Sequence, residues 1–164
     1  MNTGQTVLTI AAMFLLSVLI LRFNTTLLST SSVMLDTKFG VLGVSLATSI
    51  IEEASEKAFD SATDTTAISD INDLTYPAFL GPAPGETYEL FNDIDDFNRF
   101  TKIDSTMPSA VFTISCRVTY VDPDNLEVPS YHKTWCKKIT VTVTSPSMPD
   151  TIRMSSVYSY WYFR

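Results

Sequence analysis

The sequence predicts an α+β protein in which a long N-terminal helix packs on a C-terminal antiparallel β-sheet. Two periodicities support this prediction. Apolar residues recur every three or four positions up to Ala54, as on one face of a helix, and every second position from Ala110 onward, as along β-strands. The chain has 164 residues, which is enough for this helix and about one folded domain.

The first half of the predicted helix, 7–21, is uncharged and mostly apolar, and Arg22 follows it directly. A secretory signal peptide has a basic start and a small-x-small cleavage site, and this run has neither. A membrane span needs about 20 apolar residues, a length that is reached only if the span continues past Arg22 to Leu28. We therefore expect a retained helix that anchors the chain in a membrane.

The second half of the predicted helix is amphipathic. Its apolar stripe consists of Leu35, Phe39, Leu42, Leu46, Ile50 and Ala54. We expect one helix over 5–60 with a weak point at 24–32, because the Asn, Thr and Ser side chains there compete for backbone hydrogen bonds. This segment is expected to be helical in a membrane and melted or kinked elsewhere.

Residues 61–108 have no periodicity and contain many turn residues, so we expect an irregular, acidic connector. The following region, 109–164, predicts an antiparallel meander with strands over 110–120, 131–144 and 151–163. The last of these strands is rich in Tyr and Trp, which we expect to cover the helix as part of the sheet core.

The net charge of −7 disfavours a nucleic-acid backbone as a partner. The charges are also unevenly placed. Every charged residue from 60 to 96 is acidic, whereas the charged residues in 131–164 are mostly basic. Two surfaces of opposite sign would favour head-to-tail association of subunits. The alternative is a solvated acidic loop beside a basic sheet edge.

Cys116 and Cys136 lie on the two strands of a predicted hairpin. If they face each other, they are close enough for a disulfide, and a disulfide would place the domain in an oxidising, extracytoplasmic compartment. Arg22 alone would favour a cytoplasmic domain by the positive-inside rule. With two cysteines and no further ligand at the required spacing, the sequence does not predict a zinc site.

Asp93, Asp95 and Asp96 form the densest group of carboxylates. Calcium could use such a group, because it takes several oxygen ligands from a loop, but the EF-hand spacing is absent and a solvated turn is the alternative. His132 is the single histidine, has no nucleophile pattern around it and is expected on the surface of a strand. We therefore expect neither a cofactor nor an enzyme.

Gly4-Gln5 directly before an apolar helix, followed by an amphipathic continuation, a loop and an antiparallel sheet, resembles the type IV pilin and pseudopilin superfamily. The resemblance implies that Gly4 ends a leader clipped by a prepilin peptidase and that Gln5 begins the mature chain. It also implies an inner-membrane anchor that assembly machinery later moves into the core of an extracellular filament. The implied core residues are Val7, Leu8, Ile10, Phe14, Leu15, Val18 and Leu19.

The chain departs from this family at Thr9, where pilins usually carry a Glu that is thought to pair with a neighbouring subunit's N-terminal amine. The leader lacks a basic residue, and no Pro kinks the helix before Pro77. Three functions therefore stay open: a self-assembling filament subunit, a pseudopilin of a secretion system, and a monomeric membrane-anchored extracytoplasmic binding domain.

Overall fold

The computed structural model describes residues 2–162 and confirms the predicted α+β fold. Within this range, helix α1 runs over Thr3–Ser55 and five strands follow it. They are β1 (Thr101–Asp104), β2 (Phe112–Asp122), β3 (Asn125–Pro129), β4 (Cys136–Thr144) and β5 (Ile152–Ser159). The chain forms two compact units that divide between Lys38 and Phe39, so the two halves of α1 belong to different units.

In the first unit, the predicted weak point at 24–32 is helical. Its hydroxyl groups donate hydrogen bonds to carbonyl oxygens one turn earlier: Thr25 and Thr26 to Arg22, and Ser29 and Thr30 to Thr26. Side chains that are bonded in this way stay within the helix instead of drawing the backbone out of it. The expected melting in other surroundings stays a prediction.

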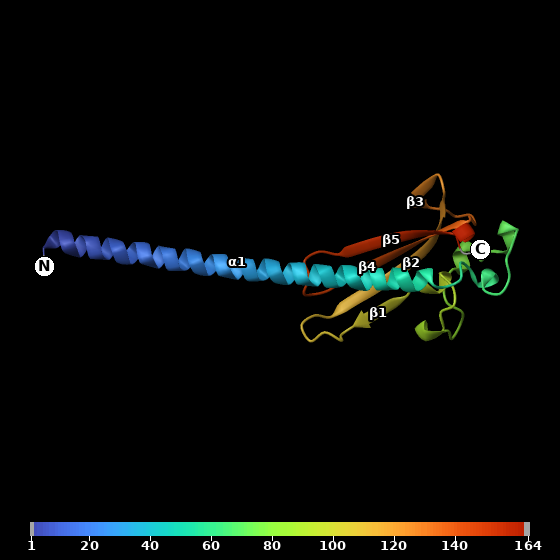
Figure 1. Ribbon diagram of the computed structural model, residues 1–164, viewed down its shortest axis with the longest axis horizontal. Helices are drawn as coiled ribbons and strands as arrows, with labels where there is room; N and C mark the ends of the chain where they lie inside the picture. The colour runs from blue at the N-terminus through green and yellow to red at the C-terminus, as the bar shows by residue number, and fades with distance from the viewer. Residues whose placement is uncertain (1, 163–164) are drawn as a thin grey trace. The chain divides into compact units, whose positions relative to one another are not determined.

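In the second unit, four strands form an antiparallel sheet in the order β1-β2-β4-β5 (Figure 1). The central pair, β2 and β4, keeps one register from Thr113 opposite Thr144 to Tyr120 opposite Lys137. β3 lies between the predicted strands 110–120 and 131–144 and pairs with the end of β2.

The core of the second unit lies between one face of this sheet and the second half of α1. The period-two pattern of β2 is confirmed, because Phe112, Ile114, Cys116, Val118 and Tyr120 are all buried. α1 contributes Phe39, Gly43, Ala47, Ile50 and Ala54 to the same core. Leu42 and Leu46 of the predicted stripe are half-buried against it, whereas Leu35 is exposed.

α1 ends five residues before the predicted boundary at 60. Ala58 explains the early end, since its N–H donates to Asn92 and its carbonyl accepts from Ile94. Those bonds form a parallel bridge to the connector, which leaves Ala58 unavailable for the helical ladder. Asp60 then caps a short 3-10 turn, Ser61–Thr63.

The connector is more ordered and more buried than the sequence predicts. It contains five 3-10 turns and the edge strand β1. Phe91, Ile94 and Phe97 belong to the core, and the half-buried rings of Tyr88 and Phe100 stack with centroids 4.7 Å apart. Aromatic packing therefore replaces long secondary structure in ordering this region.

Among the C-terminal aromatic residues, Tyr158 contacts the helix as predicted, but the last strand is shorter than expected. β5 ends at Ser159, and Tyr160–Tyr162 forms a 3-10 turn; the predicted last strand residue, Phe163, lies outside the described residues. The hydroxyl of Tyr158 donates to the carbonyl of Ile51 in α1 at 2.7 Å. His132 is exposed, as predicted. It lies in the loop before β4, however, and not on a strand, where the sequence had placed it.

Candidate functional site

The first candidate site is the apolar part of α1 in the first unit. The predicted core residues are all exposed: Val7, Leu8, Ile10, Phe14, Leu15, Val18 and Leu19. Their exposed fractions run from 39 % for Val18 to 72 % for Leu8. Consecutive residues such as Met13, Phe14, Leu15 and Leu16 are apolar, so the surface is apolar on every side of the helix.

A helix that is apolar all round is stable only where apolar groups surround it, in a protein core or in a membrane. α1 is the one helix among residues 2–162 that is long and apolar enough to cross a membrane by length and composition, and none of its most apolar window is buried. The second half of α1 differs, because its apolar stripe from Phe39 to Ala54 is buried or half-buried against the sheet. The first unit therefore needs apolar surroundings that residues 2–162 do not supply.

The residues implied in processing lie at the start of this helix. Gly4 and Gln5 are exposed in the first turn of α1, and the N–H of Gln5 donates to the carbonyl of Asn2 at 2.8 Å. Thr9, which replaces the Glu of the resembled family, donates its hydroxyl to the carbonyl of Thr6 at 2.8 Å. That bond is internal to the helix, and Thr9 brings no charge for an ionic contact between subunits.

The predicted disulfide between Cys116 and Cys136 is wrong, because both cysteines are free in the structure. Cys116 pairs with Val141, whereas Lys137 pairs with Tyr120. Cys136 is thus displaced along the pair by about five residues, roughly 17 Å at 3.4 Å per residue, and Cα atoms beyond about 7 Å cannot be bridged. The alternation of side chains also places the two thiols on opposite faces of the sheet. Without this disulfide, the two cysteines no longer indicate an oxidising compartment.

The second candidate site is a buried charge cluster, defined here as Asp60, Asp93, Asp95, Asp96 and Lys137. All five side chains are at most 3 % exposed, so the solvated turn predicted for 93–96 is wrong. Asp60 and Lys137 join the cluster from outside the predicted carboxylate group 93–96. Four of the acidic residues between 60 and 96, and one of the basic residues after 131, are therefore paired inside the fold and do not form opposing surfaces.

Lys137 lies at the centre of the cluster and is fully buried. Its Nζ is 2.7 Å from Oδ2 of Asp60 and 2.6 Å from Oδ1 of Asp95, and it donates to the carbonyl of Phe59 at 2.8 Å. The same atom lies 4.5 Å from the ring centroid of Phe59 and 5.2 Å from that of Tyr120, at a range typical of cation–π contacts.

Asp60 is saturated with donors. Besides Lys137, it accepts from the N–H and the hydroxyl of Thr75, from the N–H of Ala62 and from the hydroxyl of Tyr120. Burial raises the pKa of Asp60, but the charge of Lys137 and these hydrogen bonds together outweigh burial and hold the pKa below its usual value. Asp60 is therefore ionised at neutral pH.

The other carboxylates are less well satisfied. Burial raises the pKa of Asp95 to about 8 against the pull of Lys137. Burial and the charge of Asp96 raise the pKa of Asp93 to about 7, and burial also raises the pKa of Asp96. Three acidic groups, Asp60, Asp93 and Asp95, interact electrostatically with one lysine, so the cluster holds at least one proton under neutral conditions.

The calcium hypothesis for Asp93, Asp95 and Asp96 does not fit these contacts. Oδ1 of Asp93 accepts from the N–H groups of Asp95 and Asp96, and Oδ2 of Asp96 accepts from those of Asn92 and Asp93. Asp95 faces Lys137, a cation that already occupies the place of a metal charge. In the part of the chain that the structure describes, no group of His, Cys, Asp or Glu is arranged to hold a metal ion.

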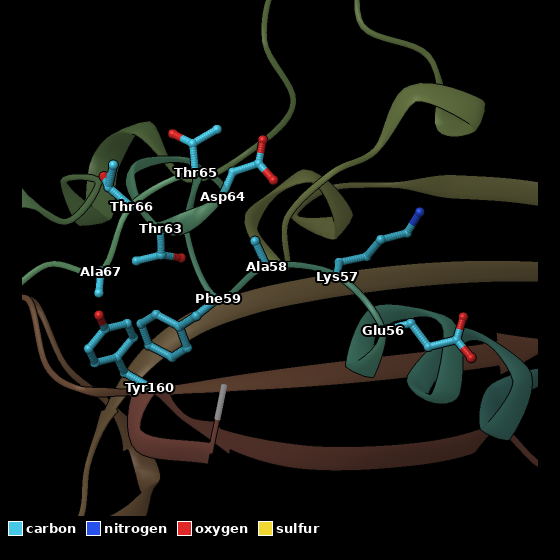
Figure 2. Close-up of a pocket in the computed structure, with 10 residues that line it drawn as sticks. All are labelled: Glu56, Lys57, Ala58, Phe59, Thr63, Asp64, Thr65, Thr66, Ala67 and Tyr160. Atoms are coloured by element: carbon cyan, nitrogen blue, oxygen red, sulfur yellow. The ribbon is translucent and has the colours of Figure 1, made fainter. Parts of the chain in front are cut away.

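A surface pocket of about 500 Å³ lies between the end of α1 and the following turn. Figure 2 shows the rings of Phe59 and Tyr160 side by side at one end of it, with the side chains of Glu56 and Lys57 at the other. The hydroxyl of Thr63 is engaged with the carbonyl of Asp60 at 2.7 Å. The polar groups of this pocket therefore do not converge on a common point, as a substrate site would require.

Comparisons with protein-family models, with curated proteins and with solved structures gave no match. The resemblance to pilins consequently rests on architecture, namely a long apolar helix that continues into an antiparallel sheet domain.

Proposed function

We propose that this chain is the structural subunit of a type IV pilus-like extracellular filament, which assembles through the apolar first half of its N-terminal helix. Before assembly the same helix holds the subunit in the inner membrane. The subunit's partners are then the membrane, the prepilin peptidase and assembly machinery implied by the resemblance, and finally other copies of itself. The sheet domain is the part of the subunit that remains in water.

The observation that supports this proposal most strongly is the exposure of apolar side chains on all sides of 7–28. Burying one Leu or Ile side chain contributes about 1.5–3 kcal/mol, and nine of the exposed side chains in 7–28 are Leu or Ile: Leu8, Ile10, Leu15, Leu16, Leu19, Ile20, Leu21, Leu27 and Leu28. A bundle of identical helices offers the same all-round apolar surroundings as a lipid bilayer. One surface can therefore serve first as an anchor and later as the core of a polymer.

Thr9 stands where pilins usually carry a Glu, and this replacement limits how neighbouring subunits can set their register. An ionic contact between Thr9 and a neighbouring N-terminus is not available, so register in the filament must come from packing and from the sheet domains. A pseudopilin would share this fold and differ in how many copies assemble, and an anchored monomeric domain would use the helix for the membrane alone.

Leu15→Asp tests the proposal directly. A buried carboxylate inside a helix bundle costs several kcal/mol, so we expect cells that express this variant to shed no filaments on shearing. Val128→Asp is the matched control, since Val128 is 57 % exposed on β3, far along the chain from the apolar helix, and filaments should persist.

The amount of subunit in the membrane fraction must be measured beside the filament yield, because Leu15→Asp can also weaken insertion. Leu15→Ala keeps the segment apolar and preserves insertion, and we expect it to lower the filament yield without lowering the membrane-bound amount. Filaments from the Leu15→Asp variant equal in amount to those of the wild type would overturn the proposal.

A further inference from the structure

The buried charge cluster places an amine nucleophile against a carboxyl group where water is excluded. Nζ of Lys137 lies 2.6 Å from Oδ1 of Asp95, and the two residues are 0 % and 2 % exposed. Lys137 comes from β4 and Asp95 from the 3-10 turn Asp95–Phe97. Two elements that lie far apart in the sequence thus bring these reactive groups into contact.

Asp95 differs from Asp60, the other carboxylate in contact with Lys137. Both oxygens of Asp60 accept hydrogen bonds from surrounding donors. Oδ2 of Asp95 is buried and has no hydrogen-bond partner among the described residues. Such an orphaned oxygen costs free energy, and an unsatisfied buried group in a native structure requires a physical explanation.

We infer that Lys137 and Asp95 become joined by an intramolecular isopeptide bond between Nζ and Cγ, formed by the chain's own residues. This cross-link goes beyond the proposed filament function and forms in the folded subunit, before and independently of any assembly. It ties the connector to the centre of the sheet.

The groups around the pair supply what amide formation requires. Asp95 is the electrophile, because a buried carboxyl whose pKa is raised to about 8 carries its proton at neutral pH, and a neutral acid accepts a nucleophile far better than a carboxylate does. Asp60 is the proton acceptor, because its ionised Oδ2 lies 2.7 Å from the same Nζ. The rings of Phe59 and Tyr120 lie over Nζ and limit the access of water.

The reaction balances without an added reagent. Asp60 takes one proton from the Lys137 ammonium, and the freed nitrogen lone pair attacks Cγ of Asp95 to form the Nζ–Cγ bond. One Cγ–O bond then breaks, and the oxygen leaves as water with the carboxyl proton and a second proton from Nζ. The third proton remains on the amide nitrogen. Holding the reactants in contact replaces a bimolecular step with a unimolecular one, an advantage of up to about 10⁵–10⁸ M in effective concentration.

Mass spectrometry of the full-length wild-type protein, digested with trypsin after denaturation and reduction, tests the bond without any variant. Trypsin cuts after Lys57 and Arg99, which releases 58–99 with Asp95, and after Lys133 and Lys138, which releases 134–138 with Lys137. We expect a branched peptide whose mass is the sum of these two minus one water. Without the bond, trypsin also cuts after the free Lys137, so separate peptides 58–99 and 134–137 at their full masses, from protein shown to be folded, would overturn the inference.

Three variants identify the linked atoms. Lys137→Arg removes the amine, so the two peptides should appear separately, with no loss of water. Lys138→Arg is the matched control and should stay cross-linked, since Lys138 contacts Glu127 at the surface. Asp95→Ala should also restore the full mass. Because 58–99 contains Asp60 as well as Asp95, a cross-link that persists in Asp95→Ala, or fragment ions that place the branch at Asp60, would overturn the assignment to Asp95.

Discussion

The two halves of helix α1 are built from similar apolar residues and satisfy them in opposite ways. In the second half, a stripe that includes Phe39, Ile50 and Ala54 is buried on the chain's own sheet. In the first half, apolar residues such as Leu8 and Phe14 cover every side of the helix and are exposed. Burial of the apolar stripe in the second half therefore stabilises the fold, whereas the exposed apolar surface of the first half remains available for contact with lipid or with other copies.

The comparison also separates two uses of charge. The sheet unit encloses Lys137 with three interacting carboxylates, whereas the run 7–21 has no charged residue at all. Buried ions require fixed partners, so they suit a unit with one packing arrangement. The uncharged surface of 7–21 can be transferred from lipid into a helix bundle without breaking an ion pair.

Asp60→Ala should have the largest effect on the stability of the sheet unit. It leaves the Thr75 and Ala62 N–H groups unpaired and removes one of two carboxylates from buried Lys137, so we expect the free energy of unfolding to fall by about 3–5 kcal/mol. Denaturant unfolding of the full chain in detergent, followed by tryptophan fluorescence, measures the change. Asp64→Ala is the control at an exposed position after the same turn, with an expected change within about 0.5 kcal/mol. Equal effects would contradict the buried role of Asp60.

A pair of isoleucine truncations compares the two units directly. Ile114 is 2 % exposed in the core, and Ile10 is 68 % exposed on the first half of α1. Ile114→Ala should lower the free energy of unfolding of the sheet unit by about 2–5 kcal/mol, because it leaves a cavity. Ile10→Ala should leave that quantity unchanged and lower the filament yield. If Ile10→Ala lowered the free energy of unfolding of the sheet unit as much as Ile114→Ala, the claim that the first half of α1 does not stabilise the fold would be wrong.

The pH dependence of stability tests the strained carboxylates of the buried charge cluster. Since the pKa of Asp93 is raised to about 7 in the folded state, the folded chain binds more protons than the unfolded chain between about pH 4 and 7, and stability falls as pH rises. Oδ1 of Asp93 accepts both of its hydrogen bonds from N–H groups, and an Asn carbonyl can do the same. Between pH 5 and 8 the wild type should lose about 1–3 kcal/mol more than Asp93→Asn. If the free energies of unfolding of the wild type and of Asp93→Asn change in parallel between pH 5 and 8, the pKa of Asp93 is not raised in the folded state.

Two glycines of α1 offer the smallest and most local comparison. A Cβ at Gly43 would lie 3.2 Å from Cγ1 of Ile152 and 3.6 Å from Sδ of Met148, whereas a Cβ at Gly40 would meet nothing within 4 Å. Gly40→Ala should raise the free energy of unfolding by about 0.5–1 kcal/mol through helix propensity. At Gly43 the close approach of β5 should cancel that gain. A larger gain at Gly43 than at Gly40 would contradict the tight packing of helix on sheet.

Periodicity predicted the fold because the main elements are long enough to repeat it. The alternation of Phe112, Ile114 and Val118 marks one face of β2 without reference to any other part of the chain. The strand β1 was missed because four residues, three of them exposed, carry no alternation that sequence could reveal. It exists through its pairing with β2.

The sites were predicted less well, because they depend on register and on distant partners. The disulfide prediction failed on register and on parity, since Cys136 lies five residues from the position opposite Cys116 and faces the other side of the sheet. The same parity holds the signal for Lys137, which is a charged residue on the otherwise apolar face of β4 that carries Ile139 and Val141. Its partner Asp60 lies 77 residues earlier, and only the tertiary fold brings the two together.

Negative-stain microscopy of sheared cell-surface material, combined with mass spectrometry of the N-terminal peptide of this chain, tests whether the chain is a processed filament subunit. We predict thin filaments whose subunit begins at Gln5. An intact Met1 on a chain that stays in the membrane fraction, with no filaments present, would contradict it and show that the apolar half of α1 serves as an anchor alone.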